Sequence, residues 1–302
     1  MENKKRINYV NEYFKNKFGE RTLKICVDGN FTCPNRDGTC GFGGCIFCSE
    51  RGSGEHIEGN SAISKQVEKY FNSYHAQRAN KFIVYFQNFT NTYDTLENLK
   101  SKYDAALIDK RIVGISIATR PDCINEEITK LLASYSKKYY VCVELGLQTA
   151  DEKIGTFINR CYTNNSFTKA VELLNKYNID VIAHIMVGLP HETEKSIKKT
   201  IEFINSHSIQ GLKIHSTYVI KNTKLADLYL NKDYEPITLE YYLNVLSFIL
   251  THISPKLIIH RISGDAPKDL LLAPDWNLHK KWILNGIEKK LKDENLWQGK
   301  YF

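Results

Sequence analysis

Residues 33–48 read Cys33-Pro-Asn-Arg-Asp-Gly-Thr-Cys40-Gly-Phe-Gly-Gly-Cys45-Ile-Phe-Cys48. Three of these cysteines, Cys33, Cys45 and Cys48, have the spacing Cys-x11-Cys-x2-Cys. The glycines and turn-forming residues between them let the backbone fold tightly, but they offer almost no apolar surface to bury. Such a loop needs another source of order, and thiolates around a metal centre supply one. We therefore expect these three cysteines to hold a metal.

The spacing alone leaves the kind of metal centre open. A structural zinc site usually has four ligands, and Cys26 or Cys40 could supply the fourth thiolate. An iron–sulfur cluster is also normally held by four cysteines, and three would leave one iron open to another ligand, as a catalytic cluster requires. A redox dithiol at Cys45 and Cys48 is a third interpretation, but it does not explain Cys33.

Composition narrows the class of protein. The chain has 302 residues, enough for one large α/β domain or two small ones. Its net charge of +7 mildly favours anionic partners and is far below that of a nucleic-acid coat protein. Eight cysteines without framework spacing favour a reducing compartment. We find no signal peptide and no apolar run of ~18 residues, so we expect a cytoplasmic protein with no membrane partner.

Strands and helices alternate along most of the chain. Near-continuous apolar runs, typical of strands covered on both faces, predict strands at 23–27, 82–86, 112–118, 140–145, 181–187 and 212–218. Helical patterns predict helices at 7–18, 62–77, 95–106, 126–137, 167–177 and 194–206. Six β-α units predict a parallel sheet curled into a partial (β/α)6 barrel of the TIM type, because a closed eight-stranded barrel usually needs ~250 residues.

The pattern changes after residue 219. A helix at 239–253, a strand at 256–262 and a helix at 276–292 are expected to form a small α/β extension rather than another barrel unit. We therefore divide the chain into a partial barrel with an N-terminal helix at 1–219 and a C-terminal extension at 220–302 that packs on it. Reactive groups are expected at the C-terminal ends of the barrel strands.

The sequence in and around the cysteine loop resembles that of a known family. Its matching segments are Gly29-Asn-Phe-Thr-Cys33-Pro-Asn-Arg-Asp-Gly, Gly43-Gly-Cys-Ile-Phe-Cys48 and Gly52-Ser-Gly54. They resemble the radical S-adenosylmethionine (SAM) enzymes of the YhcC/YtqA-like family, which is similar to the radical SAM domain of the Elongator catalytic subunit. Further matches recur in order between about residues 20 and 275.

The resemblance implies a set of cofactors. A 4Fe–4S cluster on Cys33, Cys45 and Cys48 would bind SAM through its open iron. One electron from the reduced cluster would cleave SAM to methionine and a 5′-deoxyadenosyl radical, which abstracts hydrogen from an unactivated carbon. Phe47 would shield the cluster and lie near the adenine. A reductant such as flavodoxin or ferredoxin is the implied partner.

Polar residues at the strand ends are candidates for contacts with SAM. Most radical SAM enzymes carry Gly-Gly-Glu after the second strand, whereas this chain has Gln87 and Thr90 there. Glu144, inside an apolar strand, would be costly to bury without a donor or a cation. The resemblance suggests the ribose hydroxyls as its partner, and a structural ion pair is the alternative. The expected cofactor contacts are Phe47, Gln87, Thr90, Ser116, Glu144, Gln148 and Gly188.

Other segments that resemble the family are candidates for substrate binding. Arg120 could clamp a carboxylate or phosphate, or form a loop salt bridge with Asp122. Tyr162 stands where the family's Asn-Arg-Gly-His has histidine. The turn at 260–267 either faces the substrate or forms a cap held by an Arg–Asp pair. The expected substrate contacts are Arg120, Arg160, His260, Arg261 and Asp265.

Two side-chain patterns, the histidines on apolar strands and the tryptophans of the C-terminal tail, can be explained by packing alone as well as by function. His184 and His215 lie on apolar strands, where a histidine is more often a satisfied core residue than a proton donor. In the C-terminal tail, lysines beside Trp276, Trp282 and Trp297 could contact RNA. A cationic amphipathic helix packed by its tryptophans explains that tail equally well.

The resemblance to the Elongator catalytic subunit points to tRNA as substrate. Relatives in the YhcC/YtqA-like group are linked to converting the 5-carboxymethylaminomethyl side chain of the wobble uridine to 5-aminomethyl. We expect this reaction or a similar radical modification of a tRNA base. The alternatives are radical chemistry on a small metabolite or peptide, and a zinc-stabilised RNA-binding protein without catalysis.

Overall fold

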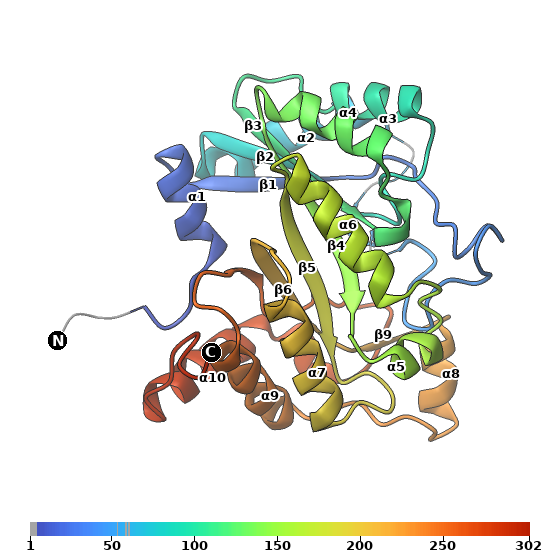
Figure 1. The fold of residues 1–302 in the computed structure, drawn as a ribbon, viewed down its shortest axis with the longest axis vertical. Coiled ribbons are helices and arrows are strands. Elements are labelled where there is room, and N and C mark those ends of the chain that lie inside the picture. The colour runs from blue at the N-terminus through green and yellow to red at the C-terminus, as the bar shows by residue number, and fades with distance from the viewer. Residues whose placement is uncertain (1–4, 53, 58, 60) are drawn as a thin grey trace.

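A seven-stranded parallel sheet forms the centre of the molecule (Figure 1). The computed structural model describes residues 5–52, 54–57, 59 and 61–302. The strand order is β1-β2-β3-β4-β5-β6-β8, and neighbouring strands pair in parallel. The strands are β1 Thr22–Val27, β2 Lys81–Phe86, β3 Ile112–Thr119, β4 Tyr140–Gln148, β5 Asp180–Val187, β6 Gly211–Ser216 and β8 Ile258–Arg261.

Helices follow most strands and lie outside the sheet, from α3 and α4 at one end to α9 and α10 at the other (Figure 1). Several begin where a side chain accepts from a backbone N–H of the first turn, which satisfies an otherwise unpaired donor. These capping residues are Thr95, Asn125, Asp151, Thr193, Thr223 and Thr238. The helices are α1 Val10–Phe18, α2 Ile63–Phe71, α3 Leu96–Asp104, α4 Glu126–Ser136, α5 Glu152–Phe157, α6 Asn164–Lys176, α7 Glu194–Asn205, α8 Lys224–Leu230, α9 Leu239–His252 and α10 Lys280–Asp293.

The two faces of the sheet differ in chemistry. On β4, Val143 and Leu145 belong to the apolar core between the sheet and the helices. Glu144 and Gly146 alternate with them and line a cavity on the other face. Successive side chains of a strand point to opposite faces, so the curled sheet has an apolar outside and a polar inside.

The partial barrel expected from the sequence is confirmed, with one correction. Strand β8, predicted to lie in a separate extension, pairs in parallel with β6 and is the seventh strand of the same sheet. Helix α1 contacts both edge strands, β1 and β8, and buries Phe14 beneath the opening between them. The division of the chain at residue 219 stays a prediction.

The remaining described elements are short. Strands β7 (Val219–Ile220) and β9 (Leu271–Ala273) form a small antiparallel sheet. Three 3-10 helices span Tyr74–Arg78, Pro121–Cys123 and Asp275–Leu278. No helix within the described residues is long and apolar enough to cross a membrane.

Candidate active site

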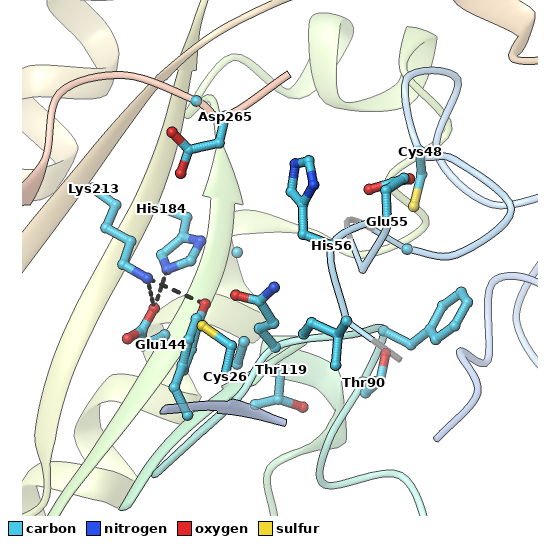
Figure 2. A pocket seen from close by; sticks show the side chains of 18 of the residues that line it. Cys26, Cys48, Glu55, His56, Thr90, Thr119, Glu144, His184, Lys213 and Asp265 are labelled. Carbon is cyan, nitrogen blue, oxygen red and sulfur yellow. Dashed lines mark hydrogen bonds and ion pairs between the residues drawn. The ribbon is translucent and has the colours of Figure 1, made fainter. Parts of the chain in front are cut away.

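A cavity of about 710 Å³ lies inside the curled sheet. Its walls are the inward side chains of β1 to β6 and β8, together with the cysteine loop and the turn after β8. Figure 2 shows Glu144, His184 and Lys213 gathered on one side of the cavity and Cys48 on the opposite side. Reactive groups were expected at the C-terminal ends of the strands, but Lys24 and Lys213 each lie at the third residue of a six-residue strand.

The cysteine loop is held in place by side-chain amides. Asn35 Nδ2 donates to Asn159 O at 2.6 Å, and Asn159 Nδ2 donates to Gly44 O at 2.7 Å. Arg36 donates to Cys48 O at 3.1 Å. Gly44 has a φ of 77°, and a Cβ there would lie 3.0 Å from the Arg36 side chain, so the turn requires glycine. These bonds aim Cys33, Cys45 and Cys48 into the cavity.

The chemistry of the three thiols fits a cluster. Burial raises the pKa of Cys45 to about 12 and also raises the pKa of Cys48. These two thiols therefore keep their protons at neutral pH unless a bound metal displaces the protons. Among the described residues, no group of three or more His, Cys, Asp or Glu side chains is arranged to hold a single metal ion. The three cysteines line one cavity, and an iron–sulfur cluster is held by thiolates that each bind a separate iron.

Glu144 is buried on β4 and accepts from four side chains. Its Oε1 accepts from Lys24 Nζ at 2.6 Å and from Ser116 Oγ at 2.6 Å. Its Oε2 accepts from His184 Nε2 at 2.8 Å and from Lys213 Nζ. We call Glu144 and these four partners the Glu144 network. Both carboxylate oxygens are occupied in the structure, as the ion-pair interpretation of Glu144 expects.

The Glu144 network carries a positive charge that depends on pH. Burial opposes the charge on Glu144, but Lys213 and Lys24 hold its pKa well below the usual range. Burial also opposes the charge on Lys24, but Glu144 raises its pKa. Burial lowers the pKa of Lys213 to about 7, and burial with the nearby Lys213 lowers that of His184 to about 4. Two lysines therefore share one carboxylate below pH 7.

Most of the predicted contact residues meet at the cavity. Arg120 also makes the predicted salt bridge, with its Nε and Nη2 donating to Asp122 at 2.9 and 2.7 Å. Ser116 does not line the cavity itself but supports Glu144 from β3. Thr90 Oγ1 is buried and has no hydrogen-bond partner within the described residues, as expected of a group that awaits a ligand. The predicted residues that line the cavity are Phe47, Gln87, Thr90, Glu144, Gln148, Arg120, Arg261 and Asp265.

The structure does not bring Arg160, predicted to contact substrate, to the cavity. The Arg160 side chain is fully buried and donates to Leu147 O at 2.8 Å and Thr149 O at 2.7 Å. It also pairs with Glu152 at 2.9 Å. Its donors are thus used to fix the end of β4 against the start of α5.

His260 and Gly188 also lie away from the cavity lining. His260 packs edge-on against Phe14 of α1, with ring centroids 6.1 Å apart. Gly188 lies in a separate depression, where its carbonyl accepts from the Tyr234 hydroxyl at 2.6 Å. Both residues therefore contact other parts of the protein, and the expected contacts of Gly188 with SAM and of His260 with substrate stay predictions.

Sequence reasoning missed two central lysines. Lys24 and Lys213 each interrupt an apolar strand, as Glu144 does on β4. Tyr85 on β2 was also missed, and its hydroxyl accepts from Lys213 Nζ at 3.1 Å at the edge of the Glu144 network. The signal was a single charge inside each of three apolar runs, because buried charges of opposite sign are normally paired.

Comparison with protein families identifies the fold and its chemistry. A model of the radical SAM superfamily matches residues 37–204, more than half of the chain. The chain belongs to this superfamily. A model of the radical SAM C-terminal domain matches residues 209–293.

Individual relatives agree with this assignment. The chain is 38% identical to YtqA of Bacillus subtilis over 99% of this chain and 93% of YtqA. It is 32% identical to YhcC of Escherichia coli over 91% of this chain and 89% of YhcC. The solved structure of Elp3 from the archaeon Methanocaldococcus infernus has a TM-score of 0.70 at 17% identity, covering 92% of this chain and 64% of that one. The resemblance to YhcC/YtqA-like radical SAM proteins is confirmed, and the Elp3 structure shows the same fold.

A radical SAM enzyme uses a 4Fe–4S cluster and SAM and needs a reductant. We propose that Cys33, Cys45 and Cys48 would hold the cluster, because these three cysteines of one loop all line the cavity. When bound, the two cofactors supply a radical that removes hydrogen from a carbon of the substrate. The protein's own task is to hold that carbon in place and to exclude water.

We expect Cys45→Ala to lose the cluster. Wild type, reconstituted without oxygen, should bind about four iron and four sulfide per chain and release 5′-deoxyadenosine from SAM. Cys45→Ala should bind little iron and release no 5′-deoxyadenosine. Cys26→Ala is the matched control, because Cys26 lines the cavity outside the loop. Iron analysis decides, and wild-type iron content in Cys45→Ala would refute the assignment.

We expect Glu144→Gln to destabilise the fold. It leaves Lys24 and Lys213 buried without a counter-charge, which typically costs about 3–5 kcal/mol. Urea unfolding of the apoprotein measures the loss. The double variant Glu144→Gln/Lys213→Met should recover part of the stability, because it removes one of the uncompensated charges. Equal unfolding midpoints for wild type and Glu144→Gln would contradict a structural role for the network.

Proposed function

We propose that this radical SAM enzyme converts a 5-carboxymethylaminomethyl side chain on a tRNA wobble uridine to 5-aminomethyl. The proposal rests on the resemblance to the Elongator catalytic subunit and on the charge of the cavity. Among the described residues that line the cavity, seven are Lys or Arg and three are Asp or Glu. SAM is itself a net cation, so this excess of positive charge favours an anionic substrate.

The position of the cations supports a carboxylate as the group they bind. Lys24 and Lys213 lie on the side of the cavity away from Cys48, as Figure 2 shows for Lys213. Arg261, nearer the opening, pairs with Asp265 at 3.0 Å and is one-third exposed. A substrate carboxylate near the lysines would direct the adjoining carbon toward the cysteine side, where the cofactors bind. Ammonium and guanidinium groups are the usual partners of carboxylates in proteins.

The proposed conversion balances without an additional oxidant. The substrate amine loses its carboxymethyl group as glyoxylate, water supplies the aldehyde oxygen, and the primary amine stays on the uridine. This removes two electrons from the substrate. SAM accepts two electrons overall when it becomes methionine and 5′-deoxyadenosine. One SAM is therefore consumed for each glyoxylate released, and the reductant serves only to start turnover.

We expect tRNA nucleosides to report this activity. In cells that lack the gene, mass spectrometry should show loss of 5-aminomethyluridine derivatives and accumulation of their 5-carboxymethylaminomethyl precursors. The wild-type gene should restore the product, and Cys45→Ala should not. Cys26→Ala is the control for expression and should restore it. An unchanged nucleoside profile in the deletion strain would count against tRNA and favour a small metabolite or peptide as substrate.

We expect substrate binding to weaken as the pH rises through 7. The pKa of Lys213 is lowered to about 7, so its positive charge is present below that pH and is lost above it. A charge-assisted hydrogen bond contributes about 1.5 kcal/mol or more, so KM should rise about tenfold or more between pH 6 and 8.5. Glyoxylate release from a carboxymethylaminomethyl stem-loop RNA measures KM. Lys213→Met should have a high KM that changes little with pH, and an equally steep profile in that variant would exclude Lys213 as the cause.

A further inference from the structure

The tryptophan at the start of α10 is exposed without a structural reason. The helix buries Ile283, Ile287 and Leu291 against the core. Trp282 is not part of this buried face of the helix and is 53% exposed. Trp276, just before the helix, is only 6% exposed and packs in the core. The packed-helix interpretation of the tail therefore explains Trp276 but not Trp282, whose side chain is half exposed.

The ring of Trp282 is held in a fixed orientation. It stacks on His279 with ring centroids 4.0 Å apart and an angle of 23° between the planes. The Trp282 backbone N–H also donates to His279 O at 2.8 Å. Because His279 covers one face of the ring, the exposed half belongs to the other face and the edge. A rigid ring with one open face is suited to stacking another flat group.

Positive charge surrounds this ring and leads to the cavity. Lys280 and Lys281 are exposed beside Trp282. Lys280 Nζ lies 3.5 Å from Asp265, which lines the cavity. The whole of α10 has five lysines against one glutamate and one aspartate. We call His279, Lys280, Lys281 and Trp282 the α10 platform, and it touches the cavity lining through the ion pair between Lys280 and Asp265.

We propose that the α10 platform binds a single-stranded RNA loop, with one base stacked on Trp282 and the lysines on neighbouring phosphates. This inference rests on the proposed function. An enzyme that acts on a base must take that base out of its stack, which leaves the adjacent base without a stacking partner. An aromatic ring on the α10 platform replaces the lost partner, and an aromatic ring beside lysines is a common way to bind single strands.

Binding of a labelled, unmodified anticodon stem-loop RNA at fixed salt tests the platform. Trp282→Ala should raise Kd at least about fivefold, since stacking of one base contributes about 1–3 kcal/mol. Trp282→Phe should retain most of the affinity. Lys281→Met should reduce the slope of log Kd against log salt concentration by about one, which is the contribution of one phosphate contact. A fully paired RNA duplex should bind more weakly and should not respond to Trp282→Ala.

Two controls distinguish loss of the platform's contact with RNA from loss of any exposed aromatic ring and from misfolding of the variant. Tyr301→Ala removes an aromatic ring of similar exposure, 55%, at the C-terminus and should leave Kd unchanged. Cleavage of SAM without RNA should be the same in Trp282→Ala as in wild type, which confirms that the variant is folded and loaded. Equal stem-loop binding by wild type and Trp282→Ala would overturn the platform and leave the proposed function intact. Failure of wild type to bind the unmodified stem-loop would also overturn the platform, whereas the proposed function is decided separately by the nucleoside profile of the deletion strain.

Discussion

The buried carboxylate of Glu144 is the interaction on which the inside of the barrel depends. It lies on β4, whereas Lys24 and Lys213 reach it from β1 and β6, strands that are not its neighbours in the sheet. Contacts between strands so far apart require the sheet to curl, because side chains on a flat sheet could not meet in this way. Each charge on its own would be costly to bury, so the three residues hold the curvature together.

The alternation of strands and helices could be predicted from the sequence, but the polar character of the sheet's inner surface could not. The strands read as apolar runs covered on both faces, yet residues such as Glu144 and Lys213 give the inner face a polar character. Helices α5 and α8 span less than two full turns and are too short to show helical periodicity. Strand β8 was recognised as a strand, but its pairing with β6 depends on the long-range path of the chain, which local patterns do not contain.

The candidate site was predictable where the chemistry is local. The cysteine loop carries its three candidate ligands within sixteen residues, so their spacing alone suggested a metal centre. Glu144 was noticed because its charge conflicts with its apolar surroundings. Its two lysine partners were missed because they lie on other strands, and only the fold decides which charges meet. The donors of Arg160 were taken by carbonyls of β4 and the turn after it, and no sequence motif identifies such backbone acceptors.

Under the proposed function, the cavity would bind an anionic group beside Lys24 and Lys213 and its cofactors beside the cysteine loop, and this separation would limit what it accepts as substrate. Hydrogen transfer requires the reacting carbon to lie next to the cofactor, so the group bound by Lys24 and Lys213 has to be joined to that carbon by a short linker. A phosphate of the RNA backbone is separated from the base side chain by the sugar and the ring. A carboxylate carried on the side chain itself is bonded directly to the carbon that reacts. The geometry therefore favours a substrate whose anionic group and reactive C–H bond belong to the same small side chain.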